Sequence, residues 1–321
     1  MKKLEDIKKI AVLGAGTMGP GIAQTYAAGG YVVTMWTRSD STREKALTAL
    51  KSQFETFVQQ GELTAEAAEA ALSRISFRAT VEEAVEGADF IQETITENRE
   101  AKVALYEQLA AVVPADVIIA SNTSAMNIFE VVPEKLLPQQ LICHWYAPPQ
   151  LIPLVEVVKS EQAPQEAADT AIALLNGCGK TAVLMKKFIQ GYIVNRLQQC
   201  LNREVFYLLD NGYCDAEAID LAAKTSFIPR ACVLGLVKRM DFGSLNMTAN
   251  NYRNHSYHMP EHGDEMPHVL EEHVAHGELG IKTGHGFYDY TGMDIEELKR
   301  KRDEQLFEIF RLEKKFLSDP V

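Results

Sequence analysis

Residues 7–36 read IKKIAVLGAGTMGPGIAQTYAAGGYVVTMW, and they specify the architecture of the first half of the chain. A β-branched run ends at three glycines spaced as G-x-G-x-x-G, after which apolar residues recur at helical spacing. A second β-branched run follows at 31–36. The stretch therefore predicts a strand, a tight turn, a helix and a second, parallel strand reached by a right-handed crossover.

The same alternation continues along the chain. Strand-like segments recur at 88–94, 116–121, 140–146, 152–158 and 181–185. Helical periodicity is found at 41–60, 64–73, 101–113 and 164–175. Alternation of this kind predicts an α/β fold, a doubly wound and mostly parallel sheet of the Rossmann type with helices on both faces.

The pattern changes near residue 188. Beyond it the periodicity is helical, at 192–209, 216–223, 266–274 and, in a highly charged amphipathic form, 295–317. We therefore expect two domains, an α/β domain over 1–188 and an all-α C-terminal domain over 189–321.

Composition excludes several classes of protein. The 321 residues carry a net charge of −12, with 44 acidic against 32 basic side chains, which disfavours binding to nucleic acid or to an anionic membrane. The charged N-terminus and the absence of an apolar run of about 18 residues predict a cytoplasmic protein. The 5 cysteines form no Cys-x-x-Cys pair, and we expect buried, reduced thiols.

The glycine-rich turn lies after a strand and opens a helix, as a dinucleotide-binding fingerprint requires. Gly14 allows the tight turn, Gly16 leaves room for a pyrophosphate, and Gly19 lets helix and strand pack closely. Thr17 and Met18 lie at the helix N-terminus, where free N–H groups and the helix dipole favour an anion. The turn therefore predicts an NAD or NADP site.

The end of the second strand indicates which dinucleotide binds. An acidic residue that accepts the ribose 2′-hydroxyl of NAD is missing, and the chain instead reads Thr37-Arg38-Ser39. The Arg38 guanidinium can pair with a 2′-phosphate, and the two hydroxyls can add donors. We therefore predict a preference for NADP; the alternative is that Arg38 stacks on the adenine or points to solvent.

Candidate catalytic residues follow later strands. Ser124 lies just beyond the strand that ends at Ser121, at the sheet edge where open α/β folds bind ligands. His144 and Glu156 fall on two neighbouring predicted strands. A histidine paired with a carboxylate can exchange a hydroxyl proton while hydride leaves the same carbon, so this pair is a candidate general acid–base.

Six motifs in order resemble the 3-hydroxyacyl-CoA dehydrogenase family. They are the glycine motif of 14–24, Glu-x-Ile-x-Glu-Asn of 93–98 with Lys102, Ser-Asn-Thr-Ser of 121–124, the block of 144–156, Gly-Tyr-Ile-Val-Asn-Arg of 191–196 and Gly-Ile-Lys-Thr-Gly-His-Gly-Phe-Tyr of 280–288. The resemblance covers nearly the whole chain and implies a reversible oxidation of a 3-hydroxyacyl-CoA, as in fatty acid metabolism, by a homodimer built through the helical domains.

The resemblance also implies roles for single residues. His144 would be the acid–base and Glu156 its partner, while Ser124 and Asn195 would hydrogen-bond the reacting oxygen and the carbonyl. The remaining positions would line the ribose and nicotinamide side of the cofactor site: Glu97, Lys102 and Asn122.

The chain departs from the family pattern at positions that bear on the substrate. His-Phe-Phe-Asn-Pro becomes His-Trp-Tyr-Ala-Pro at 144–148, Pro-Gly-Phe becomes Gln-Gly-Tyr at 190–192, and Gly-Pro-Phe becomes Leu-Gly-Leu at 234–236. The segment 148–156 looks more like gulonate and carnitine dehydrogenases. Two alternatives therefore stay open: a dehydrogenase of a free 3-hydroxy acid, and a catalytically silent dinucleotide-binding protein.

Six of the 8 histidines fall within 255–276. Two His-x-x-His pairs could seat a transition metal if they came together, but neither has a recognised ligand spacing. Hydride transfer to nicotinamide needs no metal. We therefore expect no metal site here.

Overall fold

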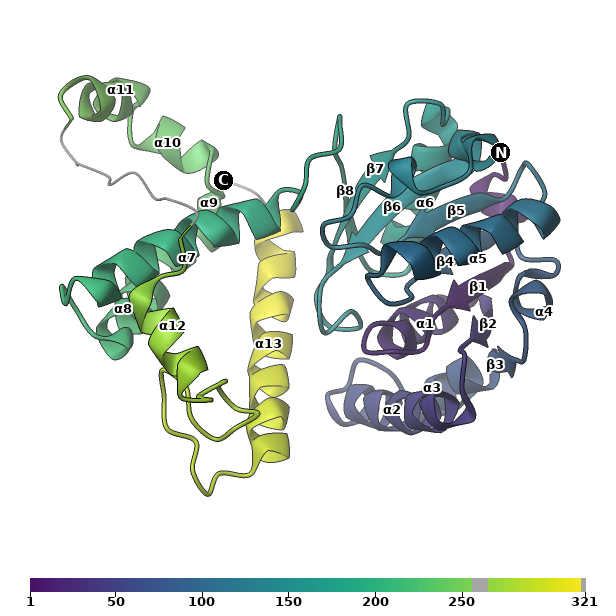
Figure 1. The fold of residues 1–321 in the computed structure, drawn as a ribbon, viewed down its shortest axis with the longest axis horizontal. Helices are drawn as coiled ribbons and strands as arrows, with labels where there is room; N and C mark the ends of the chain where they lie inside the picture. Colours follow the sequence, from purple (N-terminus) through teal and green to yellow (C-terminus); the bar gives the residue numbers. More distant parts are fainter. Residues whose placement is uncertain (256–264, 319–321) are drawn as a thin grey trace. The chain divides into compact units, whose positions relative to one another are not determined.

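A computed structural model describes residues 1–255 and 265–318. The chain divides into two compact units, Met1–Val194 and Asn195–Val321 (Figure 1). This division lies six residues beyond the domain boundary expected after residue 188. The intervening segment, which includes Tyr192 and Val194, hydrogen-bonds to the first unit at Thr123 and Glu156.

The first unit is built on an eight-stranded sheet with the order β3-β2-β1-β4-β5-β6-β7-β8. All neighbouring strands run parallel except β6 and β7, which are antiparallel. The strands are β1 (Lys9–Leu13), β2 (Val32–Trp36), β3 (Ile75–Arg78), β4 (Phe90–Glu93), β5 (Ile118–Ser121), β6 (Gln140–Trp145), β7 (Leu154–Lys159) and β8 (Thr181–Leu184). The order reverses between β1 and β4, which is where open α/β sheets bind ligands.

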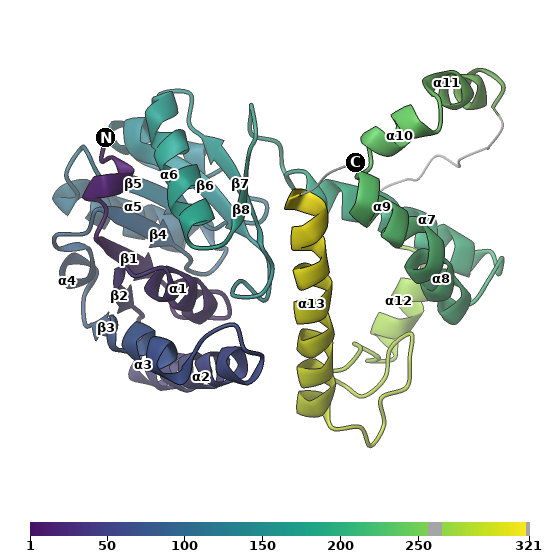
Figure 2. The ribbon, with the colours of Figure 1, turned by 180° about the vertical axis from the view of Figure 1, so that it is seen from behind.

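Helices cover both faces of this sheet (Figures 1 and 2). Alternate residues of β1 point to opposite faces, so Ile10 and Val12 join one core and Ala11 and Leu13 the other. The first core is covered by α1 (Gly19–Ala28), α2 (Asp40–Gln59), α3 (Ala65–Ser73) and α6 (Gln165–Gly177). The second is covered by α4 (Val81–Val85), α5 (Arg99–Val112) and the short 3-10 helices Ile128–Glu130 and Glu134–Gln139.

Side-chain caps fix where several of these helices begin. The Oγ atoms of Ser39, Thr64 and Thr80 each accept a hydrogen bond from a backbone N–H of α2, α3 and α4 respectively. Asn98 does the same for α5 through its side-chain oxygen. Because such caps satisfy N–H groups that have no partner within the helix, they set the residue at which each of these helices begins.

The second unit is helical in the residues described. Its α-helices are α7 (Val194–Asp210), α8 (Ala216–Ala222), α9 (Ile228–Leu234), α10 (Lys238–Phe242), α11 (Leu245–Arg253), α12 (His268–Ala275) and α13 (Ile295–Ser318). The first residue of α7, Val194, is the last residue of the first unit. A π-helical turn covers Ala223–Phe227. None of the helices in 1–255 and 265–318 combines the length and the apolar character that a membrane span needs.

The expected fold class, a Rossmann-type sheet followed by a helical C-terminal region, is confirmed. The sequence patterns did not predict β3 and α4, which have four and five residues. The expectation of buried cysteines holds fully for Cys143 alone. Cys178 and Cys214 are half-buried, and Cys200 and Cys232 are exposed on helices of the second unit, where the expectation is wrong. Burial raises the pKa of the Cys143 thiol to about 12.

Candidate active site

The glycine turn after β1 has the geometry that a bound dinucleotide needs. Gly14 has a φ of +117°, and a Cβ there would collide with the backbone of Thr94. A Cβ at Gly19 would collide with the carbonyl oxygen of Gly14, which explains the close packing of helix and strand. Gly16 faces open space, so a ligand can approach its backbone closely.

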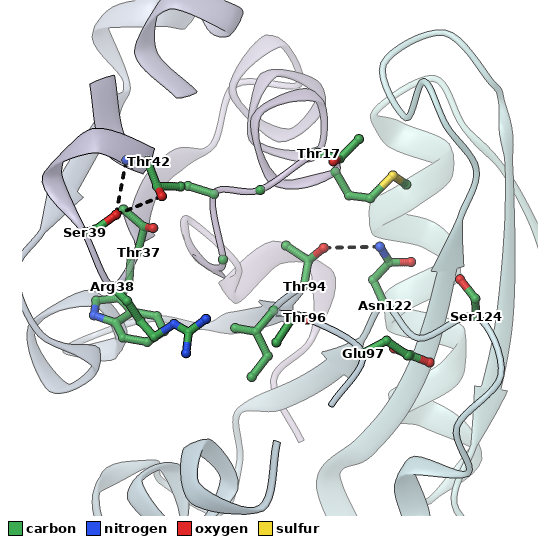
Figure 3. Close-up of a pocket in the computed structure, with 16 residues that line it drawn as sticks. Thr17, Thr37, Arg38, Ser39, Thr42, Thr94, Thr96, Glu97, Asn122 and Ser124 are labelled. Carbon is green, nitrogen blue, oxygen red and sulfur yellow. Dashed lines mark hydrogen bonds between the residues drawn. The ribbon is translucent and has the colours of Figure 1, made fainter. Parts of the chain in front are cut away.

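A cavity of about 800 Å³ lies over this turn, at the point where the strand order reverses (Figure 3). Its lining comes from the ends of β1, β2, β4 and β5: Gly14, Ala15, Gly16, Thr17, Met18, Trp36, Thr37, Arg38, Ser39, Thr42, Thr94, Ile95, Thr96, Glu97, Asn122 and Ser124. The structure thus brings together every residue expected to bind the cofactor except Gly19, which packs beneath the turn, and Lys102.

The end of the cavity beyond β2 is formed by Arg38 and its neighbours. Arg38 is exposed, and it also lines a second cavity of about 240 Å³ together with Trp36 and Ile95. Ser39 is engaged in capping α2, since its Oγ accepts from the N–H of Thr42 at 3.3 Å and lies 2.9 Å from the Thr42 hydroxyl (Figure 3). The guanidinium of Arg38 therefore offers the positive charge at this end, next to the N-terminus of a 20-residue helix.

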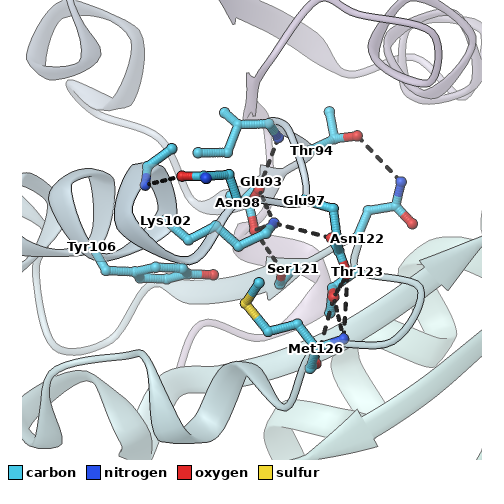
Figure 4. A network of polar contacts seen from close by, with 12 residues as sticks. Glu93, Thr94, Glu97, Asn98, Lys102, Tyr106, Ser121, Asn122, Thr123 and Met126 are labelled. Atoms are coloured by element: carbon cyan, nitrogen blue, oxygen red, sulfur yellow. Dashed lines mark hydrogen bonds and ion pairs between the residues drawn. The ribbon is translucent and has the colours of Figure 1, made fainter. Parts of the chain in front are cut away.

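Lys102 lies behind the cavity and does not line it. Its Nζ donates to both oxygens of Glu93, at 2.7 and 2.8 Å, and both side chains are completely buried (Figure 4). The Ser121 hydroxyl and the N–H of Ile95 also donate to this carboxylate. Lys102 therefore reaches the cofactor side only through Glu97, whose Oε2 is 3.9 Å away.

Glu97 and Asn122 join neighbouring strand ends beside the cavity. Oε1 of Glu97 accepts from the Thr123 hydroxyl at 2.5 Å and from the N–H groups of Ala125 and Met126. The Asn122 amide donates to the Thr94 hydroxyl at 3.2 Å, and its oxygen accepts from the N–H of Trp145 at 3.0 Å. These bonds hold the ends of β4, β5 and β6 in a fixed relation.

His144 and Glu156 meet across the antiparallel pair of β6 and β7. They are direct register partners, and Nδ1 of His144 lies 3.0 Å from Oε2 of Glu156. The side chain of His144 is 3% exposed and that of Glu156 is fully buried. A buried carboxylate at Nδ1 orients the ring and stabilises its protonated form, as an acid–base histidine requires.

Glu156 accepts four hydrogen bonds. Oε1 accepts from the backbone N–H groups of Ile193 and Val194, at 2.9 and 3.2 Å, where α7 begins. Oε2 accepts from the Tyr146 hydroxyl at 2.5 Å as well as facing His144. Burial by itself raises the pKa of Glu156, but these hydrogen bonds outweigh it and hold that pKa below its ordinary value. The carboxylate is therefore ionised at neutral pH.

Two tyrosines that the sequence argument did not select enclose His144. The ring of Tyr192 stacks on the imidazole, with centroids 4.5 Å apart, and its hydroxyl donates to the carbonyl of Thr123. Tyr146 contacts the other partner, Glu156, and its ring lies 4.6 Å from that of His144. Both tyrosines stand where the family pattern has phenylalanine. This departure is the one feature of the sequence from which their place at the site could have been predicted.

Ser124 and Asn195 lie on different units. Ser124 is exposed and lines the cavity of the first unit. Asn195 is the first residue of the second unit, directly after Val194 and within α7. Its expected role stays a prediction.

In the part of the chain described, no three His, Cys, Asp or Glu side chains are grouped so that they could hold a metal ion. His273 faces Glu278 instead, with Nδ1 2.5 Å from Oε2. His258 and His262 lie outside the described residues.

Comparison with known families decides the identity of this arrangement. Residues 9–188 match the model for the 3-hydroxyacyl-CoA dehydrogenase NAD binding domain, and residues 191–290 match that for the 3-hydroxyacyl-CoA dehydrogenase C-terminal domain. The chain belongs to the 3-hydroxyacyl-CoA dehydrogenase family. The expected enzyme class, an NAD(P)-dependent dehydrogenase acting on a hydroxyl group, is thereby confirmed.

Relatives within this family differ in their substrates. The chain is 34% identical over 286 residues to a probable 3-hydroxybutyryl-CoA dehydrogenase of Bacillus subtilis, covering 89% of this chain and 98% of the relative. It is 29% identical over 307 residues to 5-formyl-3-hydroxy-2-methylpyridine 4-carboxylate 5-dehydrogenase of Mesorhizobium japonicum, covering 95% and 98%. A crystal structure of an enzyme of that activity, described as an NAD+ dependent dismutase, matches with a TM-score of 0.85 at 26% identity, covering 96% and 99%.

Proposed function

We propose that this protein interconverts a 3-hydroxyacyl-CoA and the corresponding 3-ketoacyl-CoA, with His144 as the acid–base. The observation that carries the proposal is the buried His144–Glu156 pair, with Nδ1 and Oε2 3.0 Å apart. The pair lies in the same unit as a cavity whose glycine turn fits a dinucleotide pyrophosphate.

The cofactor site is assigned to the cavity beside the glycine turn. The backbone at Gly16, Thr17 and Met18 would hold the pyrophosphate at the N-terminus of α1. Glu97 and Asn122 line the side toward the β5 end and Ser124. The bound nicotinamide supplies the hydride acceptor in oxidation and the donor in reduction.

The protein's own groups move the proton. Because Nδ1 of His144 faces Glu156, proton exchange with the substrate falls to Nε2. In oxidation, Nε2 takes the hydroxyl proton, and the ionised Glu156 stabilises the imidazolium that forms. In reduction, the same nitrogen returns the proton. The Ser124 hydroxyl and the Asn195 amide are assigned as donors to the reacting oxygen and the neighbouring carbonyl.

NADP is assigned as the preferred cofactor. The support is the exposed Arg38 guanidinium at the β2 end of the cavity, next to the hydroxyls of Thr37 and Thr42. A planar guanidinium can pair with a 2′-phosphate through two hydrogen bonds, and no carboxylate lines this cavity near Arg38.

A free carboxylic acid is the second candidate substrate. The support is the relative that acts on a pyridine carboxylate, which matches this chain over almost its full length. Ala147 also stands where the family pattern has asparagine, so the polar side chain three residues after His144 is lost. The two candidates share the acid–base pair and differ in the group that flanks the reacting carbon.

We also assign the protein as a homodimer formed through its second units. Large apolar side chains of this unit are exposed, among them Val237, Phe242 and Tyr252. Exposed apolar side chains that gather in one patch favour a protein partner. Light scattering after size exclusion is expected to give twice the chain mass of 35.7 kDa; a monomer at micromolar concentration contradicts the assignment.

The test of function is a matrix of initial rates. Each rate is measured with NADPH and with NADH. The substrates are acetoacetyl-CoA, free 3-keto acids and an aromatic carboxylic acid that carries a formyl group. Turnover of the thioester with kcat/KM at least tenfold above the free acids supports the first candidate. Turnover of free acids alone supports the second, and no turnover of any substrate by the folded protein overturns the proposal.

A further inference from the structure

The hydroxyl of Tyr146 and the imidazole of His144 share one oxygen of Glu156. Oε2 lies 2.5 Å from the Tyr146 hydroxyl and 3.0 Å from Nδ1 of His144. The centroids of the two rings are 4.6 Å apart and the ring planes are inclined at 62°, an edge-to-face arrangement in which both rings reach the same carboxylate oxygen. The phenol is a third member of the acid–base arrangement.

Strand geometry explains why these two residues meet at one carboxylate. His144 lies on β6, and Tyr146 follows two positions later, just after β6 ends at Trp145. Residues two apart along an extended chain point to the same side, while Trp145 points to the other. Glu156 is the cross-strand partner of His144 on β7, so it faces both side chains.

The other polar groups around His144 and Glu156 either hydrogen-bond to the second oxygen of Glu156, Oε1, or do not bind Glu156. The N–H groups of Ile193 and Val194 donate to Oε1. Tyr192 covers the imidazole face, but its hydroxyl donates to the carbonyl of Thr123. The carboxylate of Glu97, whose charge acts on Tyr192, accepts a hydrogen bond from the Thr123 hydroxyl. In the first unit, Oε2 therefore has two side-chain donors, His144 and Tyr146.

We propose that Tyr146 is a positioning residue that sets the proton affinity of the His144–Glu156 pair. By donating to Oε2, its hydroxyl fixes the carboxylate and withdraws negative charge from the oxygen that attracts the imidazole proton. The pair then releases its proton at a lower pH than it would with phenylalanine at this position. This inference rests on the proposed role of His144 as the acid–base.

The phenol is suited to act as a permanent donor. Burial, together with the hydrogen bond to Glu156 and that residue's charge, raises the pKa of Tyr146, so the hydroxyl keeps its proton across the working range of the enzyme. A hydrogen bond to a charged acceptor is stronger than a neutral one. Its loss is expected to move the titration of the pair by on the order of one pH unit.

The test compares Tyr146→Phe with the wild type in a pH profile of kcat/KM for oxidation. In this direction the acid limb reports protonation of the free enzyme's base. Removal of the phenol leaves more charge on Oε2, so the acid limb is expected to move to higher pH by about 0.5–1 unit, while the rate on the plateau falls less than about tenfold. An unchanged limb, or one that moves to lower pH, overturns the proposal.

Tyr26→Phe is the matched control. Tyr26 is a buried tyrosine of the first unit whose hydroxyl donates to Gln92 at 3.2 Å, and the Gln92 oxygen keeps a second donor in Trp145. The same atom is deleted without touching Glu156. The acid limb is expected to stay in place in this variant; a shift equal to that of Tyr146→Phe would assign the effect to general loosening of the unit.

A second measurement separates this inference from the proposed function. The histidine ring resonances are followed by NMR during a pH titration, with His144→Gln identifying the signal of His144. This experiment needs no substrate, so it stands even if no dehydrogenase activity is found. The titration midpoint of that signal is expected to be higher in Tyr146→Phe than in the wild type, and equal midpoints overturn the inference.

Fluorination of Tyr146 tests the opposite direction and keeps the ring in place. 3-Fluorotyrosine at position 146 is a stronger hydrogen-bond donor, so it is expected to lower the titration midpoint of the His144 signal. This test remains valid if Tyr146→Phe fails to fold. A midpoint that stays where it is or rises in the fluorinated protein contradicts the proposal.

Discussion

His144 and Glu156 are direct partners across the antiparallel pairing of β6 with β7, and their side chains meet at 3.0 Å. Parallel strands need a long crossover, whereas antiparallel strands can be joined by a short connection. The reversal at β7 therefore lets only residues 146–153 separate the two strands. Because backbone pairing fixes the register, the acid–base pair is aligned before any ligand binds.

Replacement of His144 by glutamine is expected to lower kcat by about 10²–10⁴-fold, since the variant has no group that can exchange the substrate proton. The amide can still hydrogen-bond near Glu156, so the fold is expected to persist. Rates of NADPH consumption with the best keto substrate measure the effect. Binding of NADPH, followed by fluorescence, should be unchanged; a near-normal kcat contradicts the role of His144.

Replacement of Glu156 by glutamine is expected to destabilise the protein in a pH-dependent way. The folded-state pKa of Glu156 lies below its ordinary value of 4.5, so its ionised form stabilises the fold above that value. This stabilisation is lost as the pH falls through the lower, folded-state pKa. The melting temperature of Glu156→Gln should therefore lie furthest below that of the wild type at pH 7.

Calorimetry at pH 7 and at successively lower values below 4.5 measures this difference. Glu44→Gln, on the exposed side of α2, is the matched control and should follow the wild type at every pH. A gap in melting temperature that widens as the pH falls, rather than narrowing, contradicts the sign of the effect.

Sequence alone predicted most of the first unit because glycine spacing and strand–helix alternation are local signals. β3 escaped because it follows α3 after the single residue Arg74 and is only partly buried, whereas the equally short β5 is buried throughout. α4 has five residues, too few for a helical period. α4 is recognisable mainly by its cap, where the Thr80 hydroxyl accepts from the N–H of Glu83. Local patterns therefore find buried strands and helices of several turns, while a partly buried strand or a one-turn helix depends on what packs around it.

The parts of the site that sequence did not predict depend on contacts across the fold. Tyr146 matters because β7 turns back beside β6 and presents Glu156 to it. Tyr192 reaches His144 because its backbone has a φ of +49°, unusual for an aromatic residue. Lys102 has the spacing of a cofactor ligand, but α5 directs it inward to Glu93. None of these arrangements is encoded by spacing along the chain.

Replacement of Arg38 by alanine tests the cofactor preference. If the guanidinium pairs with a 2′-phosphate, the variant should lose about tenfold or more in affinity for NADPH and little for NADH. Fluorescence titration with each nucleotide measures the ratio. Arg43→Ala is the matched control, because Arg43 is exposed on the same helix end and pairs with Asp40 at 3.1 Å. An equal loss for both nucleotides would indicate that Arg38 contacts the adenine instead.

Replacement of Lys102 by methionine distinguishes a structural role from a cofactor contact. The Lys102–Glu93 pair is fully buried, so the substitution leaves a carboxylate inside the first unit without its counter-charge. Loss of one partner of such a pair typically costs about 3–5 kcal/mol of folding free energy. Urea unfolding is expected to show this loss, and Glu93→Gln combined with Lys102→Met should recover part of it because the unpaired charge is removed.

The affinity of the folded single variant for NADPH should change less than about threefold, since the cavity is lined by Glu97 rather than by Lys102. A large loss of affinity with unchanged stability would instead place the ammonium group on the cofactor.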